Sequence, residues 1–322
     1  MKILTNKELL EKADLTTADF GGSDEAPLSI EQFREFQRLA ITPQVVLPEV
    51  TNVDSAARKW QQSQVSFNNR IMHPGTESTR LDSSDRVAPS TNMVEIDTTL
   101  LRGEVPVSDE VFEDQVEGDA FGTTLSEMLA EAVGRDVEEL AIQADNGDAI
   151  VNHGEGASAY LQQFDGWIKQ AHSGTGANTY DATGDGTDYQ KMFKELLDAL
   201  PDRYKRDRTN WRYYVPVTLE EQYRDILANR ATGLGDMALQ GNNEITYQGI
   251  VVRGVPLFPV NSDVSFILLA NRRNLYMGWH RRITVEQFRD PREGQRSYTV
   301  TARVDAKIAE IPATALAYNV SV

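Results

Sequence analysis

Cysteine is absent from the 322 residues of this chain, and histidine is scarce. Without cysteine there is no disulfide, no thiolate nucleophile and no cysteine metal ligand. No histidine has another histidine three or four residues away, a spacing that zinc sites on helices use. The four histidines are His73, His153, His172 and His280. We therefore predict no catalytic residue, no metal site and no cofactor.

Long apolar runs are also missing. Nowhere do 18 apolar residues follow one another, which is about the length that a membrane-spanning helix needs. The N-terminal stretch MKILTNKELLEKADLTTADF has no sustained apolar core of signal-peptide length. We expect a soluble protein that is made in the cytoplasm and has no membrane partner.

Lysine is scarce as well, and acidic residues dominate the charge. Nine lysines and 23 arginines stand against 49 acidic residues, and the net charge is −17. This composition is typical of a high-salt cytoplasm, where molar salt screens repulsion beyond about 3 Å, but an ordinary acidic protein can share it. The acidic balance argues against specific nucleic-acid binding, which needs clustered bases to neutralise phosphates.

The acidic and glycine-rich loops give no sharp chemical signal. Asp181, Asp185 and Asp188 lack the alternate carboxylates and the closing glutamate of a calcium loop. A solvated acidic loop is the favoured interpretation, and loose cation binding is the alternative. The glycine pairs in 154–156 and 174–176 lack the further residues of phosphate-binding loops, so we interpret them as turns.

The N-terminal region predicts one helix and then an arm. Ser29 and Gln32 form a capping box at the start of the helix, and Thr42-Pro43 ends it. The arm that follows contains two prolines and no sustained period. We expect a neighbouring molecule to cover its apolar side chains, which are Val45, Val46, Leu47 and Val50.

A long polar segment between Gln61 and Thr91 predicts a projecting hairpin. A structureless loop of this length is uncommon inside a compact domain. Two strands that project from the body and lie on another molecule would account for it. Strand alternation resumes after the segment, at Val94, Ile96, Thr98 and Leu100.

One long amphipathic helix follows a strand, a turn and a short helix that begin at Leu101. Apolar residues recur at helical spacing over about six turns. They are Phe121, Leu125, Met128, Leu129, Ala132, Val133, Val137, Leu140, Ala141 and Ala144. The turn sequence Asp145-Asn146-Gly147 ends the pattern. Taken alone, such a helix fits any large soluble protein.

The second half of the chain predicts alternating helices and strands. A helix over 187–200 has a capping box of Thr187 with Gln190, and Pro201 ends it. Its predicted buried face is Tyr189, Met192, Phe193, Leu196, Leu197 and Leu200. The strand-like stretch WRYYVPV follows, and then a helix capped by Thr218 and Glu221. Short strands are predicted within 245–260 and 266–270.

The clearest strand lies near the C-terminus. Over the 12 residues 297–308 apolar and polar side chains alternate without a slip of register. The apolar members are Tyr298, Val300, Ala302, Val304, Ala306 and Ile308. At roughly 3.3 Å per residue the strand spans about 40 Å, which is long for a globular sheet.

Charges of opposite sign gather in two segments. Residues 104–119 hold seven acids and no base, whereas residues 272–303 hold eight arginines. Complementary surfaces of this kind suit self-association. Pairing within one chain explains the pattern equally well.

Three stretches together resemble the major capsid proteins of tailed double-stranded DNA viruses. They are GEVPVSDEVFED with RDVEELAI, then TYQGIVVRGVPLFPV with FILLANRRNLYMGW, and finally RVDAKIAEIPATALAY. The resemblance covers residues from about 30 to 322 and implies an α+β fold. The implied parts are an N-terminal arm (1–57), an extended loop (58–100), a peripheral domain with a spine helix (101–209), an axial domain (210–275) and return strands of the peripheral domain (276–322).

The resemblance implies a structural protein and no enzyme. Such a protein assembles with itself into hexamers and pentamers of an icosahedral shell that encloses packaged double-stranded DNA. We expect it in the virion, after synthesis in the host cytoplasm, and the acidic composition favours a haloarchaeal virus. Portal proteins, scaffold or decoration proteins and non-specific contact with packaged DNA are the further partners implied. An encapsulin-like nanocompartment and, less favoured, a halophilic soluble enzyme are the alternatives.

Two properties of the shell are expected from the charged residues. Some members of the family join their subunits through a lysine of the extended loop, but no lysine lies between Trp60 and Trp167, so we expect no such crosslink. The shell should also weaken as salt is removed, because the range of repulsion grows from about 3 Å at 1 M salt to about 30 Å at 0.01 M.

Overall fold

A computed structural model describes residues 44–66, 71–72, 88, 90–110, 120–147, 150–151, 159–228, 244–261 and 264–322. The helix expected from Ser29, most of the short helix before the long one, His73, His153 and the glycine pair in 154–156 lie outside the described residues.

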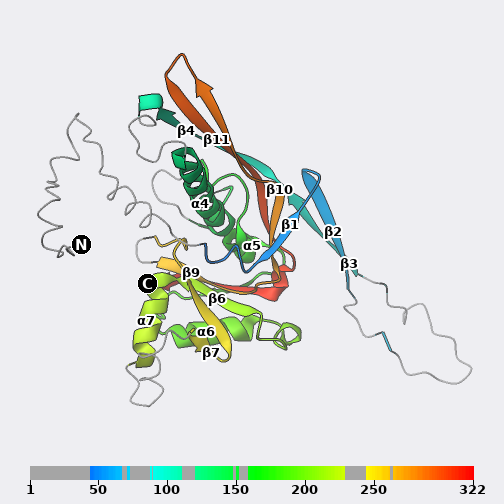
Figure 1. The fold of residues 1–322 in the computed structure, drawn as a ribbon. Coiled ribbons are helices and arrows are strands. Elements are labelled where there is room, and N and C mark those ends of the chain that lie inside the picture. Colours follow the sequence, from blue (N-terminus) through cyan, green and yellow to red (C-terminus); the bar gives the residue numbers. More distant parts are fainter. Residues whose placement is uncertain are drawn as a thin grey trace, which may run out of the picture.

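The described strands form two sheets and one separate hairpin (Figure 1). The four-stranded sheet has the order β1 (Thr51–Asp54), β10 (Leu275–Asp290), β11 (Gln295–Ile308) and β4 (Thr99–Ser108). The six-stranded sheet has the order β5 (Asn178–Asp181), β12 (Thr314–Ser321), β9 (Val264–Asn271), β6 (Trp211–Pro216), β8 (Ile250–Val255) and β7 (Thr246–Tyr247). The hairpin pairs β2 (Lys59–Ser66) with β3 (Ser90–Asp97). This mixed architecture confirms the predicted α+β class.

The long C-terminal strand is confirmed as β11. All six apolar side chains of the predicted alternation are buried, each at 5% exposure or less. β11 pairs on one side with β10 and on the other with β4, both antiparallel, over most of its 14 residues. The result is a long ribbon that extends beyond the rest of the body (Figure 1).

The predicted long helix is α4 (Ala120–Gln143), and it lies against β10 and β11 (Figure 1). Val137, Leu140 and Ala141 on its apolar face are fully buried, and the predicted turn follows at Asn146 and Gly147. The chain then returns through α5 (Trp167–Ser173), where Gly166 lies tightly against the end of α4. A Cβ at Gly166 would lie 2.9 Å from the Ala141 carbonyl oxygen, so only glycine fits there.

The six-stranded sheet has its own core and its own helices, α6 (Tyr189–Ala199) and α7 (Val217–Ala228). The predicted buried face of α6 is confirmed, because all six of its apolar residues are 6% exposed or less. Neither predicted cap is at the observed position. Asp188 caps α6 by accepting from the Lys191 N–H, and α7 begins at Val217, so that Thr218 lies inside it.

The chain crosses between the two sheets. β10 and β11 belong to the four-stranded sheet, whereas β12, which follows them, pairs with β9 and β5 in the six-stranded sheet. β5 and the apolar face of α6 belong to the six-stranded sheet and its core as well. Such long-range pairing is not encoded in the alternation within one strand.

Candidate functional site

The β2–β3 hairpin projects from the four-stranded sheet (Figure 1). Its strands pair from Lys59 opposite Asp97 to Ser66 opposite Ser90. This confirms the predicted two-stranded hairpin and places its strands at the two ends of the polar segment.

Large apolar side chains are exposed on this projection. Between the strands Ile71 is 57% and Met72 is 83% exposed, and Met93 on β3 is 56% exposed. Covering such side chains with a partner removes apolar surface from water and is favourable. The projection therefore offers a surface for another molecule.

The base of the hairpin is seated firmly on the sheet. Ile96 is 1% exposed and packs against Gly278 of β10, where an added Cβ would lie 2.5 Å from the Ile96 side chain. The Asp97 N–H donates to the Asp305 Oδ2 of β11 at 2.8 Å. Thr98 closes the base by donating its N–H and its hydroxyl to the Arg58 carbonyl oxygen.

The arm segment before β1 is held by its own chain, which corrects the expectation that a neighbour must cover it. Val46, Leu47 and Val50 are 2%, 5% and 7% exposed and belong to the core beneath α4. The sequence could not show this, because the residues that cover the segment lie about 90 positions later.

A buried carboxylate of the spine helix fixes this segment. Glu138 is 1% exposed, and its two oxygens accept the N–H groups of Val45 and Val46 at 3.0–3.1 Å. The Leu47 N–H approaches at 3.5 Å. This segment is not part of a strand, so the carboxylate supplies the acceptors that a neighbouring strand would otherwise offer to these N–H groups.

Glu138→Gln is expected to lower the free energy of unfolding by about 1–3 kcal/mol, because one acceptor oxygen becomes a donor that faces buried N–H groups. Chemical denaturation measures the change, and limited proteolysis after residue 44 reports loss of the anchor. Glu131→Gln, on the exposed face of the same helix, is the matched control. Equal stability of the two variants would contradict the anchoring role.

An ion cluster ties β4 to the far end of the ribbon. Asp109 accepts from Arg289 at 2.8 Å and from Arg296 at 3.1 Å. The hydrogen bond from Arg289, and then that from Arg296, hold the pKa of Asp109 below its usual value against the opposing effect of burial. Part of the acidic segment 104–119 thus pairs with the arginine-rich segment 272–303 within one chain. This agrees with the second of the two interpretations of these segments.

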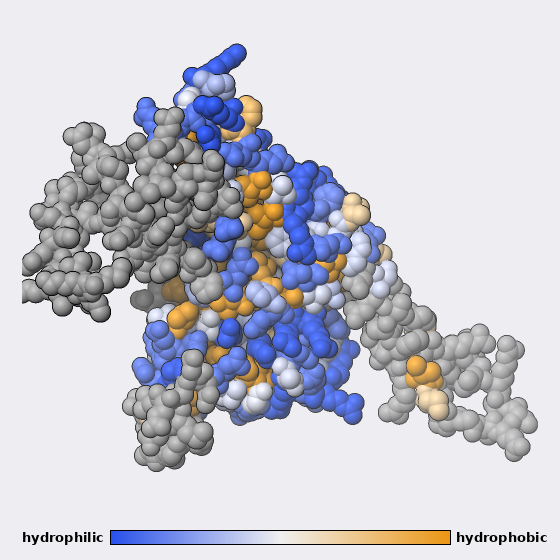
Figure 2. All heavy atoms as spheres, viewed as in Figure 1, coloured by the Kyte–Doolittle hydropathy of each residue, from blue (hydrophilic) through white to orange (hydrophobic). Residues whose placement is uncertain are grey.

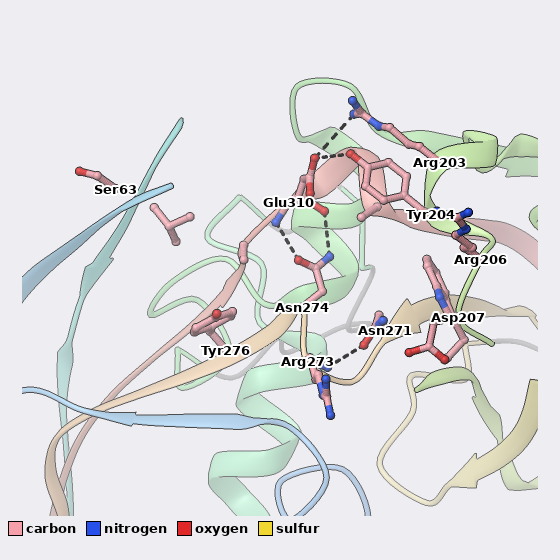
Figure 3. A pocket seen from close by; sticks show the side chains of 14 residues that line it. Ser63, Arg203, Tyr204, Arg206, Asp207, Asn271, Arg273, Asn274, Tyr276 and Glu310 are labelled. Atoms are coloured by element: carbon pink, nitrogen blue, oxygen red, sulfur yellow. Dashed lines mark hydrogen bonds and ion pairs between the residues drawn. The ribbon is translucent and has the colours of Figure 1, made fainter. Parts of the chain in front are cut away.

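A pocket of about 610 Å³ lies beside the hairpin (Figure 3). Ser63 and Val94 of the hairpin line one part of it, and loops of the body line the rest. In its wall Tyr204 donates to the Glu310 carboxylate, which also pairs with Arg203 at 3.6 Å. Burial, and next the bond to Glu310, raise the pKa of Tyr204 to about 12.

The same pocket has a charged lining with no obvious reactive group. The side-chain amide of Asn274 donates to the Glu310 carbonyl oxygen and accepts the Glu310 N–H, both at 2.8 Å, and so fixes the wall. Arg206, Asp207 and Arg273 add exposed charges to the lining. This arrangement suits contact with a charged surface better than chemistry on a small molecule.

The described ranges contain no candidate metal site. No three of their histidine and acidic side chains come together as a possible metal site. Asp181 accepts from Thr183 and Asn319, Asp185 pairs with Lys191, and Asp188 caps α6. Gly176 adopts a positive φ of 80° in the predicted turn.

Figure 2 shows mostly hydrophilic residues on the viewed face, with apolar patches along its middle. Among the described helices, none is long and apolar enough to span a membrane.

Comparison with known proteins identifies the fold. No protein-family model matches the sequence. A Bacillus subtilis protein named as a prophage capsid protein, YqbE, is 29% identical over 97% of this chain and 98% of its own length.

Solved structures extend the likeness to the whole architecture. The procapsid of satellite phage P4 matches with a TM-score of 0.61 at 12% identity, over 98% of this chain and 96% of the other. The SrpI encapsulin of Synechococcus elongatus matches with a TM-score of 0.51 at 13% identity, over 89% and 95%. The proteins to which this chain is similar are capsid and encapsulin proteins rather than enzymes. The chain therefore has the fold of tailed-phage major capsid proteins, which encapsulins share.

Proposed function

We propose that this protein is the major capsid protein of a tailed virus or prophage and assembles with itself into a closed shell. The observation that carries the proposal is the projecting hairpin with its exposed apolar residues, because an isolated monomer gives it nothing to pack against. The likeness in sequence to a prophage capsid protein over nearly the full length supports the same function.

The mode of assembly that we propose is heterologous contact between copies. A hairpin that leaves one subunit and lies on the next joins two different surfaces, and such contacts close into rings. Hexamers and pentamers of an icosahedral shell are rings of this kind. The charged pocket beside the hairpin is the region of the body that we assign to a neighbouring copy.

The remaining parts of the function follow from this proposal. Packaged double-stranded DNA would touch the shell only non-specifically, since a chain of net charge −17 repels phosphates. A portal and scaffold or decoration proteins are further proposed partners, and the virion is the proposed location. Adaptation to high salt rests on composition alone, and sedimentation of shells after dialysis to millimolar salt tests it.

An encapsulin-like compartment is the second candidate, because the fold is shared at a TM-score of 0.51 with an encapsulin. The contents of purified particles separate the two candidates. Nucleic acid in particles made during infection or induction supports the viral shell, and a folded enzyme as cargo supports the compartment.

Negative-stain electron microscopy of the purified protein tests the proposal directly, and closed shells or ring-shaped capsomers are the expected result. Boiled particles on a denaturing gel should run as one band near 36.0 kDa, because no lysine lies between Trp60 and Trp167. A ladder of bands would overturn the expectation of uncrosslinked subunits. A sharp monomer peak by light scattering at all salt concentrations would overturn the shell itself.

A further inference from the structure

One face of β11 changes character at Asp305. The alternation of the strand places this residue on the polar face, where its four nearest neighbours along the strand are partly exposed. Those neighbours are Thr299, Thr301, Arg303 and Lys307. Asp305, in contrast, is only 1% exposed. A part of the chain must therefore cover Asp305 without covering these four neighbours.

The base of the β2–β3 hairpin is that cover. The Asp97 N–H reaches the Asp305 Oδ2 at 2.8 Å. Ile96 fills the notch over Gly278, which is the cross-strand partner of Asp305 on β10. A hairpin that moved away from the sheet would therefore expose Asp305 to water.

The charge of Asp305 is poorly compensated. Among the described residues its Oδ1 has no hydrogen-bond partner, and Lys307 Nζ approaches it only to 3.9 Å. On β3 the Asp97 carboxylate adds like charge, although it is held at the surface by Lys59 of β2 at 2.9 Å and by the preceding Arg58 at 3.2 Å.

The other strands around Asp305 add no compensating partner. β10 contributes Gly278, which has no side chain, and β4 contributes Thr99 opposite the preceding Val304. Arg303 lies two residues away on the same face, and its Nε is buried without a hydrogen-bond partner. An ionised carboxylate here is desolvated without a close counter-charge.

We propose that Asp305 is a proton-controlled latch that sets how tightly the hairpin docks on the sheet. A protonated carboxyl tolerates the cover of the hairpin base. An ionised carboxylate favours water and so loosens the joint. The contact lies within one chain, so the latch can be tested whether or not the protein forms shells.

The direction of the pH effect follows from the docked geometry. Burial raises the pKa of Asp305 from 3.8 to about 6, against the smaller opposing effects of Lys307 and of the main-chain donors. Docking is therefore most favourable below the ordinary pKa and weakens as the pH rises through about 6. A carboxyl that regains its ordinary pKa on undocking changes the docking equilibrium about tenfold between pH 5 and pH 7.5.

Hydrogen–deuterium exchange of the full chain tests this latch, read at the Asp97 amide and corrected for the intrinsic pH dependence of exchange. In the wild type, protection of this amide should fall about tenfold from pH 5 to pH 7.5. Amides of β9 in the six-stranded sheet should show no such change and serve as the internal reference.

Three variants make the result decisive. Asp305→Asn should remove the pH dependence, whereas Glu104→Gln, which neutralises an exposed acid on β4 of the same sheet, should keep it. Lys307→Gln removes the nearest cation and should move the midpoint to higher pH, which tests the latch even if Asp305→Asn does not fold. Equal Asp97 protection at both pH values in the wild type, a wild-type slope in Asp305→Asn, or an unmoved midpoint in Lys307→Gln would overturn the proposal.

Discussion

Replacing the outer hairpin by a tight turn is expected to abolish shell assembly while the body of the protein stays folded. The change substitutes residues 62–94 with Asn-Gly. Gln61 and Glu95 lie directly opposite each other, so a two-residue turn closes the shortened hairpin without strain. Ile96 and Asp97 remain, and the joint with the sheet is kept.

The stability of the body should not change, because neither hydrophobic core cluster contains a residue of the hairpin. The exposed apolar residues Ile71, Met72 and Met93 disappear with the segment, and the overlap between neighbouring subunits goes with them. Circular dichroism and thermal unfolding should match the wild type, whereas sedimentation and electron microscopy should show only small species.

A substitution that keeps the length of the hairpin is the control for this experiment. Lys59→Gln removes one exposed charge at the hairpin base and leaves the projection whole, so shells should still form. Shells of wild-type diameter from the shortened chain would show that the hairpin does not hold neighbours together.

Asp145→Ala is expected to lower the free energy of unfolding by about 3–5 kcal/mol, because it leaves a partly buried lysine without its counter-charge. The side chain of Asp145 is 0% exposed and pairs with Lys169 at 3.1 Å. It also accepts the N–H groups of Gly147, Ile150 and Val151 at 2.9–3.1 Å. One carboxylate thus holds the chain as it leaves the spine helix.

Denaturant unfolding of the unassembled protein measures this loss. Asp136→Ala on α4, where the acid is 48% exposed, is the matched control and should change stability by less than about 0.5 kcal/mol. Similar unfolding midpoints for the two variants would remove the role assigned to Asp145.

Asp145 and Asp305 respond to acid in opposite directions. Burial acts to raise the pKa of Asp145, but the main-chain donors and Lys169 outweigh it and lower the pKa below 3.8. Its stabilisation is therefore complete at neutral pH and is lost only as the pH falls through that lowered value. Of these two carboxyls, only Asp305 changes its contribution between pH 7.5 and 5, which allows the two to be separated.

Much of the fold follows from local patterns in the sequence. Alternation over 297–308 predicts β11, and helical spacing predicts α4 and the buried face of α6. These elements are readable because each buries one regular face, and the period of that face is a property of consecutive residues. The absence of cysteine likewise settles by itself that no disulfide or thiolate site exists.

Only the tertiary structure decided what covers each element. The sequence gives no sign that Glu138 binds the N–H groups of Val45 and Val46, or that the hairpin base buries Asp305. The pairing of β12 with β9 is likewise not visible in the sequence of either strand. Each of these contacts joins residues that are far apart along the chain, and burial of a polar group depends on what packs over it rather than on its own neighbours in sequence.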